Sequence, residues 1–156
     1  THILSLMDGL LNNGQAGLID LNLVKSQKVL SGSSGYMVAK DYSFFQLRAN
    51  PREGQSLEDA KDLLLAEIEK IKEGDFEDWM LPAVIKNFKL NDLRSNEYNG
   101  SRVYKMTNAF IMKQDWSVIV NENDKLSTQT KQDIIDFANN MTSLTSGASF
   151  GGDIGI

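Results

Sequence analysis

The N-terminal part of the chain has apolar residues at helical spacing. They recur three and four positions apart, at Ile3, Leu6, Met7, Leu10 and Leu11. This spacing predicts an amphipathic helix, and Asn12-Asn13-Gly14 is a typical helix end. A shorter helix is expected after Gly17, with Leu18, Leu21 and Val24 on one side. Two helices joined by a glycine-containing turn are therefore predicted.

The period then changes to that of extended structure. Within residues 28–40 the stretch VLSGSSGYMVA predicts a strand interrupted by Gly and Ser, and residues 42–49 (YSFFQLRA) predict a second strand rich in aromatic residues. Lys40-Asp41 between them is typical of a hairpin turn, so the pair is expected to be antiparallel. For Tyr42, Phe44 and Phe45, packing against the core and at the sheet edge is favoured over a stacking platform for nucleic acid bases.

The most regular helical pattern follows residue 55. Ser56, with Asp59 three residues later, forms a start resembling a capping box, and Gly74 marks the end. The apolar positions are Leu57, Ala60, Leu64, Ile68 and Ile71. We expect the Glu and Lys residues of this helix to form a solvated outer face. Glu67 and Glu69 could act as paired carboxylates, but we expect both to point into water.

Residues 76–113 contain two apolar stripes. Asp78 is predicted to cap a helix whose first turn tolerates Pro82. One stripe consists of Leu81, Ile85 and Phe88, and the other of Trp79, Ala83, Leu90 and Leu93. Two stripes predict burial on two sides. A break is expected at residues 99–101, followed by a further helical face with Val103, Met106 and Phe110.

Two more helices are predicted towards the C-terminus. Asp115 is expected to cap a helix containing Trp116, Ile119 and Val120, and Thr130 with Asp133 is expected to cap a helix carrying Ile134, Ile135, Phe137 and Ala138. Residues 142–156 are rich in Gly and Ser and are expected to form a mobile tail. The predicted fold class is α+β: a short antiparallel or mixed β-sheet with several α-helices packed on one face, and the helices of residues 76–113 as the outer layer.

Composition limits the chemistry available to this fold. The chain has 156 residues, 41% of them hydrophobic and 24% charged, which fits one globular domain. Its net charge of −5, with 16 Lys and Arg scattered among 21 acidic residues, argues against nucleic acid as a partner. No apolar run approaches the ~20 residues that span a bilayer, and the N-terminal residues lack the features of a signal peptide.

Few side chains can catalyse or bind metal. The absence of Cys removes thiol catalysis and Cys-based zinc sites, and His2, the single histidine, is expected to be an ordinary surface or core residue. No H-x-x-E-H, G-x-S-x-G, Walker or EF-hand motif is present. The GSSG segment at residues 32–35 precedes a strand rather than a helix, which argues against a phosphate site there.

The succession of elements resembles a known family. The stretches that carry the resemblance are ILSLMDGLLNNGQAGLIDLNL, then VLSGSSGYMVAKDYSFFQL, then LLLAEIEKIKEGDFEDWMLPAVIKNFKL with its local string EIEKIKEGDF, and finally AFIMKQDWSVIVNENDKLSTQTKQDIIDFANN. Together they cover about residues 3–140. They resemble the C-terminal, non-catalytic half-domain of the pitrilysin/insulinase zinc metallopeptidases, the inverted zincins.

The resemblance implies a division of labour within a larger parent protein. In this family an H-x-x-E-H motif and a later glutamate form the zinc site in a preceding half-domain, so zinc is expected in the parent, and no catalytic, metal or cofactor-binding residue in this chain. Residues 1–141 would be one half-domain of a peptidase, forming part of the wall of a peptide-degrading chamber. The expected partners are a peptide substrate shared with the other half-domains and the neighbouring peptidase domains, with no nucleic acid and no membrane span.

One departure from the family concerns the substrate. Some members place an Arg and a Tyr, six residues apart, just before and within the first strand to hold the substrate backbone. Here Lys25 or Lys28 lies near the Arg position, no Tyr lies near Ser31 or Gly32, and Tyr36 is farther along. Substrate-binding residues are therefore left unassigned.

Two alternatives remain open. The chain could be a structural, assembly or peptide-binding module from a catalytically inactive member of the same family, or an unrelated ligand-binding α+β domain. The sequence does not fix the compartment, although a periplasmic or secreted place is slightly favoured over a cytoplasmic one.

Overall fold

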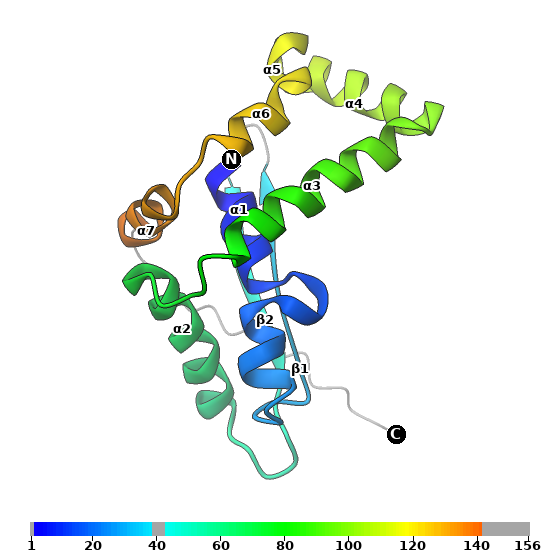
Figure 1. Ribbon diagram of the computed structural model, residues 1–156. Coiled ribbons are helices and arrows are strands. Elements are labelled where there is room, and N and C mark those ends of the chain that lie inside the picture. Colours follow the sequence, from blue (N-terminus) through cyan, green and yellow to red (C-terminus); the bar gives the residue numbers. More distant parts are fainter. Residues whose placement is uncertain (1, 39–42, 142–156) are drawn as a thin grey trace, which may run out of the picture.

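The computed structural model describes residues 2–38 and 43–141, apart from the side chains of residues 43, 119, 120, 122 and 123. The elements are α1 (His2–Leu11), the short 3-10 and π turns η1 (Gly14–Ala16) and η2 (Asp20–Val24), strands β1 (Ser31–Val38) and β2 (Ser43–Asn50), and helices α2 (Leu57–Glu73), α3 (Met80–Asn96), α4 (Asn99–Ile111), α5 (Trp116–Val120), α6 (Glu122–Ser127) and α7 (Lys131–Asn140) (Figure 1). Within the described residues, no helix combines the length and apolar character needed to cross a membrane.

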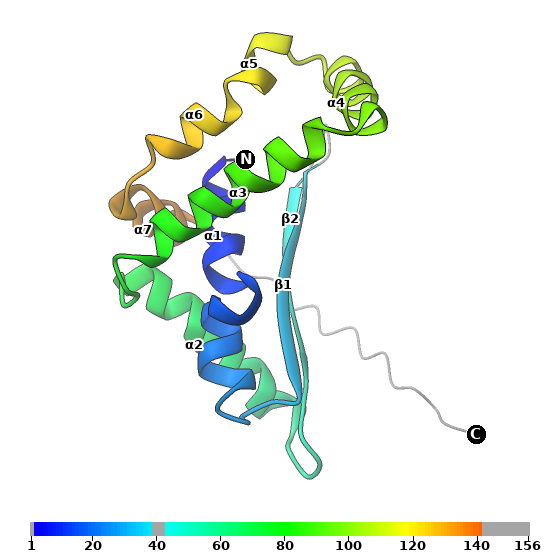
Figure 2. The same ribbon diagram turned by 45° about the vertical axis from the view of Figure 1, so that its right-hand side comes forward.

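The two strands form an antiparallel ribbon whose register runs from the Ser31–Asn50 pair to the Val38–Ser43 pair. Helix α1, helix α2 and the η1–η2 turn all lie on one side of this ribbon (Figure 2). Phe45, Leu47 and Ala49 of β2 point towards the helices. The α+β fold with helices on one face is thus confirmed, and within the described residues the sheet has two strands.

Small residues on β1 let the helical layer approach closely. A Cβ atom at Gly32 would lie 2.6 Å from Cγ2 of Ile19, so a larger residue there would push the η2 turn away from the sheet. Two positions along, Ser34 donates a hydrogen bond of 2.6 Å from Oγ to Oδ1 of Asp8 on α1. The Gly/Ser content of β1 therefore serves packing between sheet and helices.

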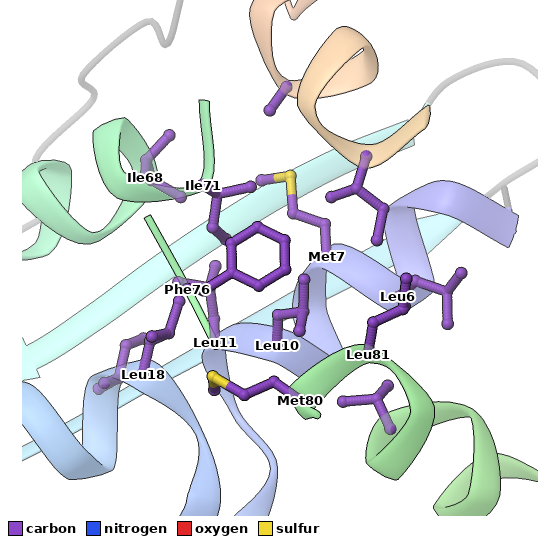
Figure 3. Close-up of a cluster of buried hydrophobic side chains, with 14 of the residues drawn as sticks. Leu6, Met7, Leu10, Leu11, Leu18, Ile68, Ile71, Phe76, Met80 and Leu81 are labelled. Carbon is purple, nitrogen blue, oxygen red and sulfur yellow. The ribbon is translucent and has the colours of Figure 1, made fainter. Parts of the chain in front are cut away.

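The core is centred on α1. Leu6, Met7, Leu10 and Leu11 are all fully buried, and Ile71 of α2 and Ile134 of α7 reach the same cluster. Figure 3 shows how α1 contributes to this cluster together with Ile68, Ile71, Phe76, Met80 and Leu81. Helix α3 covers the outer side of α1, where Gly9 faces Val84 so closely that a Cβ atom on Gly9 would overlap a γ-methyl group. The expected outer layer is therefore present at α3.

Three predicted helix starts are confirmed in atomic detail. Ser56 Oγ accepts a hydrogen bond of 3.0 Å from the Asp59 backbone N–H at the start of α2, which ends at Gly74 with φ +73°. Asp115 Oδ1 accepts one of 2.8 Å from the Ser117 N–H. Thr130 and Asp133 form a complete capping box before α7. These local signals in the sequence identify the element ends directly.

The predicted cap at Asp78 is wrong. Helix α3 begins at Met80 without a side-chain cap, and Asp78 instead accepts a hydrogen bond of 3.0 Å from Lys131 Nζ of α7. Lys131 also donates to the Phe76 carbonyl oxygen, and its ammonium group lies over the Phe76 ring. The acidic side chain is therefore drawn to a distant cation.

The second stripe predicted on α3 is not buried in this chain. Leu93 is 66% exposed, and Trp79 and Leu90 are also exposed. On the first stripe, Leu81 is buried, and Ile85 and Phe88 are partly buried against the core. The helical structure is interrupted between Asn96, where α3 ends, and Asn99, where α4 begins, just before the predicted break at residues 99–101. Helix α6 was not predicted.

Three predicted features lie outside the described residues: the hairpin turn at residues 40–41, the position of Tyr42 and the tail at residues 142–156. The division of the chain at residue 141 stays a prediction.

Candidate functional site

The two carboxylates considered as an acid/base pair do not face each other. Glu67 is only 2% exposed, and its carboxylate accepts hydrogen bonds of 2.7 Å from Asn22 Nδ2 and 2.9 Å from Lys70 Nζ. Glu69 is exposed and pairs with Lys72. The expectation that Glu67 belongs to a solvated face is therefore wrong, because the π turn η2 places Asn22 over this side of α2. Glu67 ties the turn to the helix.

Within residues 2–38 and 43–141, no three His, Cys, Asp or Glu side chains gather as a metal ligand group. His2 is half-buried at the start of α1, and the GSSG segment lies inside strand β1. Asp8 is the half-buried carboxyl that contacts this segment, through a hydrogen bond from Ser34. Burial raises the pKa of Asp8, and the hydrogen bond from Ser34 opposes that shift.

Lys25, one of the two lysines near the Arg position that the resemblance implies, is engaged within its own turn. Lys25 Nζ donates a hydrogen bond of 2.6 Å to the Gln15 carbonyl oxygen and lies 3.4 Å from Asp20. Tyr36 lies towards the end of β1 rather than at its start, and it lines the groove that is described below. Substrate-binding residues therefore stay unassigned.

As far as residues 2–38 and 43–141 are concerned, one face and both outer edges of the sheet are open. On the face away from the core, Met37 pairs with Phe44 across the strands, and both side chains are exposed. In the described part of the chain each strand has only the other as a neighbour, so each keeps one edge without a β-partner. An open strand edge offers backbone N–H and C=O groups to an added extended segment.

Helices α3 and α4 follow each other directly and are here called the α3–α4 arm. A groove of about 540 Å³ lies between this arm, the start of α1 and the end of β1. Its apolar and aromatic lining includes Tyr36, Phe88 and Tyr104. Lys105 of α4 projects into it and is bound to the Asp92 carboxylate and, at 2.6 Å, to Asn96 Oδ1. The two charges compensate each other, so the groove carries no surplus charge from this pair. Sequence patterns could not reveal this site, because its lining comes from segments far apart in the chain.

The fold is similar to that of a peptidase. A crystal structure of a protease from Helicobacter pylori matches this chain with a TM-score of 0.82 and 19% sequence identity, over 88% of this chain and 33% of that one. At this identity the match establishes the fold alone. The present chain thus spans about a third of the length of that protease. No curated protein matches this chain.

The family follows from the sequence itself. Residues 2–88 match the model of the peptidase M16 inactive domain. The chain therefore belongs to this family, and the predicted kinship is confirmed at the level of a non-catalytic C-terminal half-domain of an M16 peptidase. The alternative of an unrelated ligand-binding domain is wrong.

Proposed function

We propose that this chain is a non-catalytic half-domain of a zinc metalloendopeptidase of the pitrilysin/insulinase type, and that it forms part of the wall of a peptide-degrading chamber. The zinc ion and its ligands belong to a preceding half-domain of the parent protein. The family of this chain is that of an inactive peptidase domain, which supports a role in framing a reaction carried out elsewhere.

The one-sided sheet carries this proposal. Its inner face is fixed by a core in which α1 contributes four fully buried side chains, so the ribbon is held on a firm support. Its outer face presents Met37 and Phe44, and its edges are open within the described residues. A chamber wall needs this combination of a rigid backing and an exposed surface that can contact extended peptides.

The test requires the parent protein. An H-x-x-E-H motif upstream of this half-domain is expected, and replacing its glutamate should abolish peptide cleavage while leaving this half-domain folded. Replacing Phe44, which is exposed on the outer face, with Ser should instead weaken cleavage of long peptides and leave zinc content unchanged. A parent without the motif, or with full activity after deletion of residues 2–141, would contradict the proposal.

A second candidate is an assembly module from a catalytically inactive relative. It is favoured by an apolar stripe on α4 made of Val103, Met106 and Phe110, of which Phe110 is 84% exposed. Exposed apolar stripes of this kind mark contacts with other protein surfaces. Absence of the zinc motif from the parent, together with loss of a stable complex in a Phe110→Ser variant, would favour this candidate over the peptidase.

A further inference from the structure

We propose that the groove between α1, β1 and the α3–α4 arm binds an extended, uncharged stretch of polypeptide, holding its backbone with side-chain amides. The inference rests on the proposed function for the choice of peptide as ligand, and it assigns that peptide a contact site separate from the strand edges.

The hydrogen-bonding capacity of the groove comes from carboxamides. Asn91 of α3, Asn108 of α4 and Gln114 line it, and their side chains make no hydrogen bond to another described residue. A carboxamide offers one acceptor oxygen and two donor hydrogens, which is the complement of a peptide group. Three such groups around one groove can pair with successive backbone N–H and C=O groups of a bound strand.

Three other polar side chains of the groove lining, those of Ser5, Ser95 and Lys105, are already hydrogen-bonded. Ser5 Oγ donates a 2.7 Å hydrogen bond to the His2 carbonyl oxygen, and Ser95 Oγ donates a 2.9 Å hydrogen bond to the Asp92 carbonyl oxygen. Lys105 is held by Asp92 and Asn96. Since Lys105 is committed to these partners, it is not available as the counter-charge of a phosphate or carboxylate ligand, whereas a neutral backbone needs no counter-charge.

The apolar lining supplies a place for side chains. Tyr36, Phe88 and Tyr104 present aromatic rings to the groove, and Val38 and Met112 add aliphatic surface. Its volume of about 540 Å³ lies within the ~300–1,000 Å³ of typical ligand sites. The lining therefore favours a peptide with an apolar or aromatic residue between uncharged neighbours.

The test uses the chain itself and a short blocked peptide of Gln, Ser and Val with a central Phe, titrated by calorimetry or fluorescence anisotropy. Binding is expected, and N-methylation of the central backbone amides should abolish it, because the methyl groups remove the donors. Asn91→Ala and Asn108→Ala should each weaken binding about 2- to 10-fold, as loss of one hydrogen bond implies. Asn140→Ala, on α7 and outside the groove, is the matched control and should bind like the unaltered chain.

Three results would overturn the proposal: no binding of the blocked peptide at millimolar concentration, equal binding by the Asn91→Ala, Asn108→Ala and Asn140→Ala variants, or tighter binding of a peptide in which the neighbours of Phe are Asp. None of these would contradict the wall function, which is judged by zinc content and cleavage. Conversely, zinc-dependent cleavage by the chain alone would refute the wall function and leave the groove measurement intact.

Discussion

Replacing Gly9 with Ala tests the central packing of the fold, the crossing of α3 over α1. Two effects oppose each other. Ala is a better helix former than Gly by about 0.5–1 kcal/mol. The new Cβ atom would overlap a γ-methyl group of Val84 and approach Phe88 Cε2 to 3.3 Å, and overpacking of this kind costs about 1–3 kcal/mol. We therefore expect a net loss of about 1 kcal/mol, or roughly 2–4 °C in Tm for a chain of this size.

Two further variants make the comparison decisive. Gly100, in the first turn of α4, has nothing within 4 Å of its Cβ position, so Gly100→Ala should show only the helix-propensity gain and raise Tm slightly. In a Val84→Ala background the overlap is gone, and Gly9→Ala should there become stabilising by about 0.5–1 kcal/mol. Thermal melts followed by circular dichroism measure the Tm of the unaltered chain, the three single variants and the double variant. If Gly9→Ala raises Tm in the unaltered chain as much as Gly100→Ala does, the described contact between α1 and α3 is refuted.

Three other predictions address individual residues. Ile68, at 3% exposure, should lose about 2–5 kcal/mol of unfolding free energy on replacement by Ala, and an unchanged urea midpoint would count against its place in the core. Asn22→Ala leaves the buried Glu67 carboxylate without one of its two hydrogen bonds and should cost about 1.5–3 kcal/mol; a loss below experimental error would show that the η2 turn does not rest on α2. The pKa of Asp8 is raised by burial, so the folded state holds this proton more tightly than the unfolded chain does. The free energy of unfolding should therefore fall as the pH rises from the ordinary carboxyl pKa of 3.8 through the raised pKa of the folded state, and Asp8→Asn should remove this decline. Parallel pH profiles for the two proteins would contradict the assignment.

The sequence was most informative where structure is decided by neighbouring residues. Ser56 and Asp59, Asp115, and Thr130 with Asp133 cap their helices as predicted because each cap is formed by residues within three positions. Gly74 ends α2 since its positive φ suits glycine. Packing against the core, which was expected among the aromatic residues of β2, is found at Phe45.

Predictions failed where a distant segment decides the outcome. Asp78 is a residue type that commonly caps helices, but its carboxylate accepts a hydrogen bond from Lys131, more than fifty residues away in the sequence. Glu67 belongs to a run of charged residues, which predicts a solvated face. It is buried because the π turn η2 places Asn22 against it. Leu93 has helical spacing, yet no described element covers it. The groove was not predicted for the same reason, since its amides come from separate segments.

The most direct test of the account is a metal and activity measurement on this chain alone. Purified from a zinc-containing medium, it is expected to hold no stoichiometric zinc by elemental analysis and to leave unstructured peptides uncut, while the parent protein binds zinc and cleaves the same peptides. Stoichiometric zinc held by this chain, or turnover that a chelator abolishes, would contradict the claim that it frames a reaction performed by another half-domain.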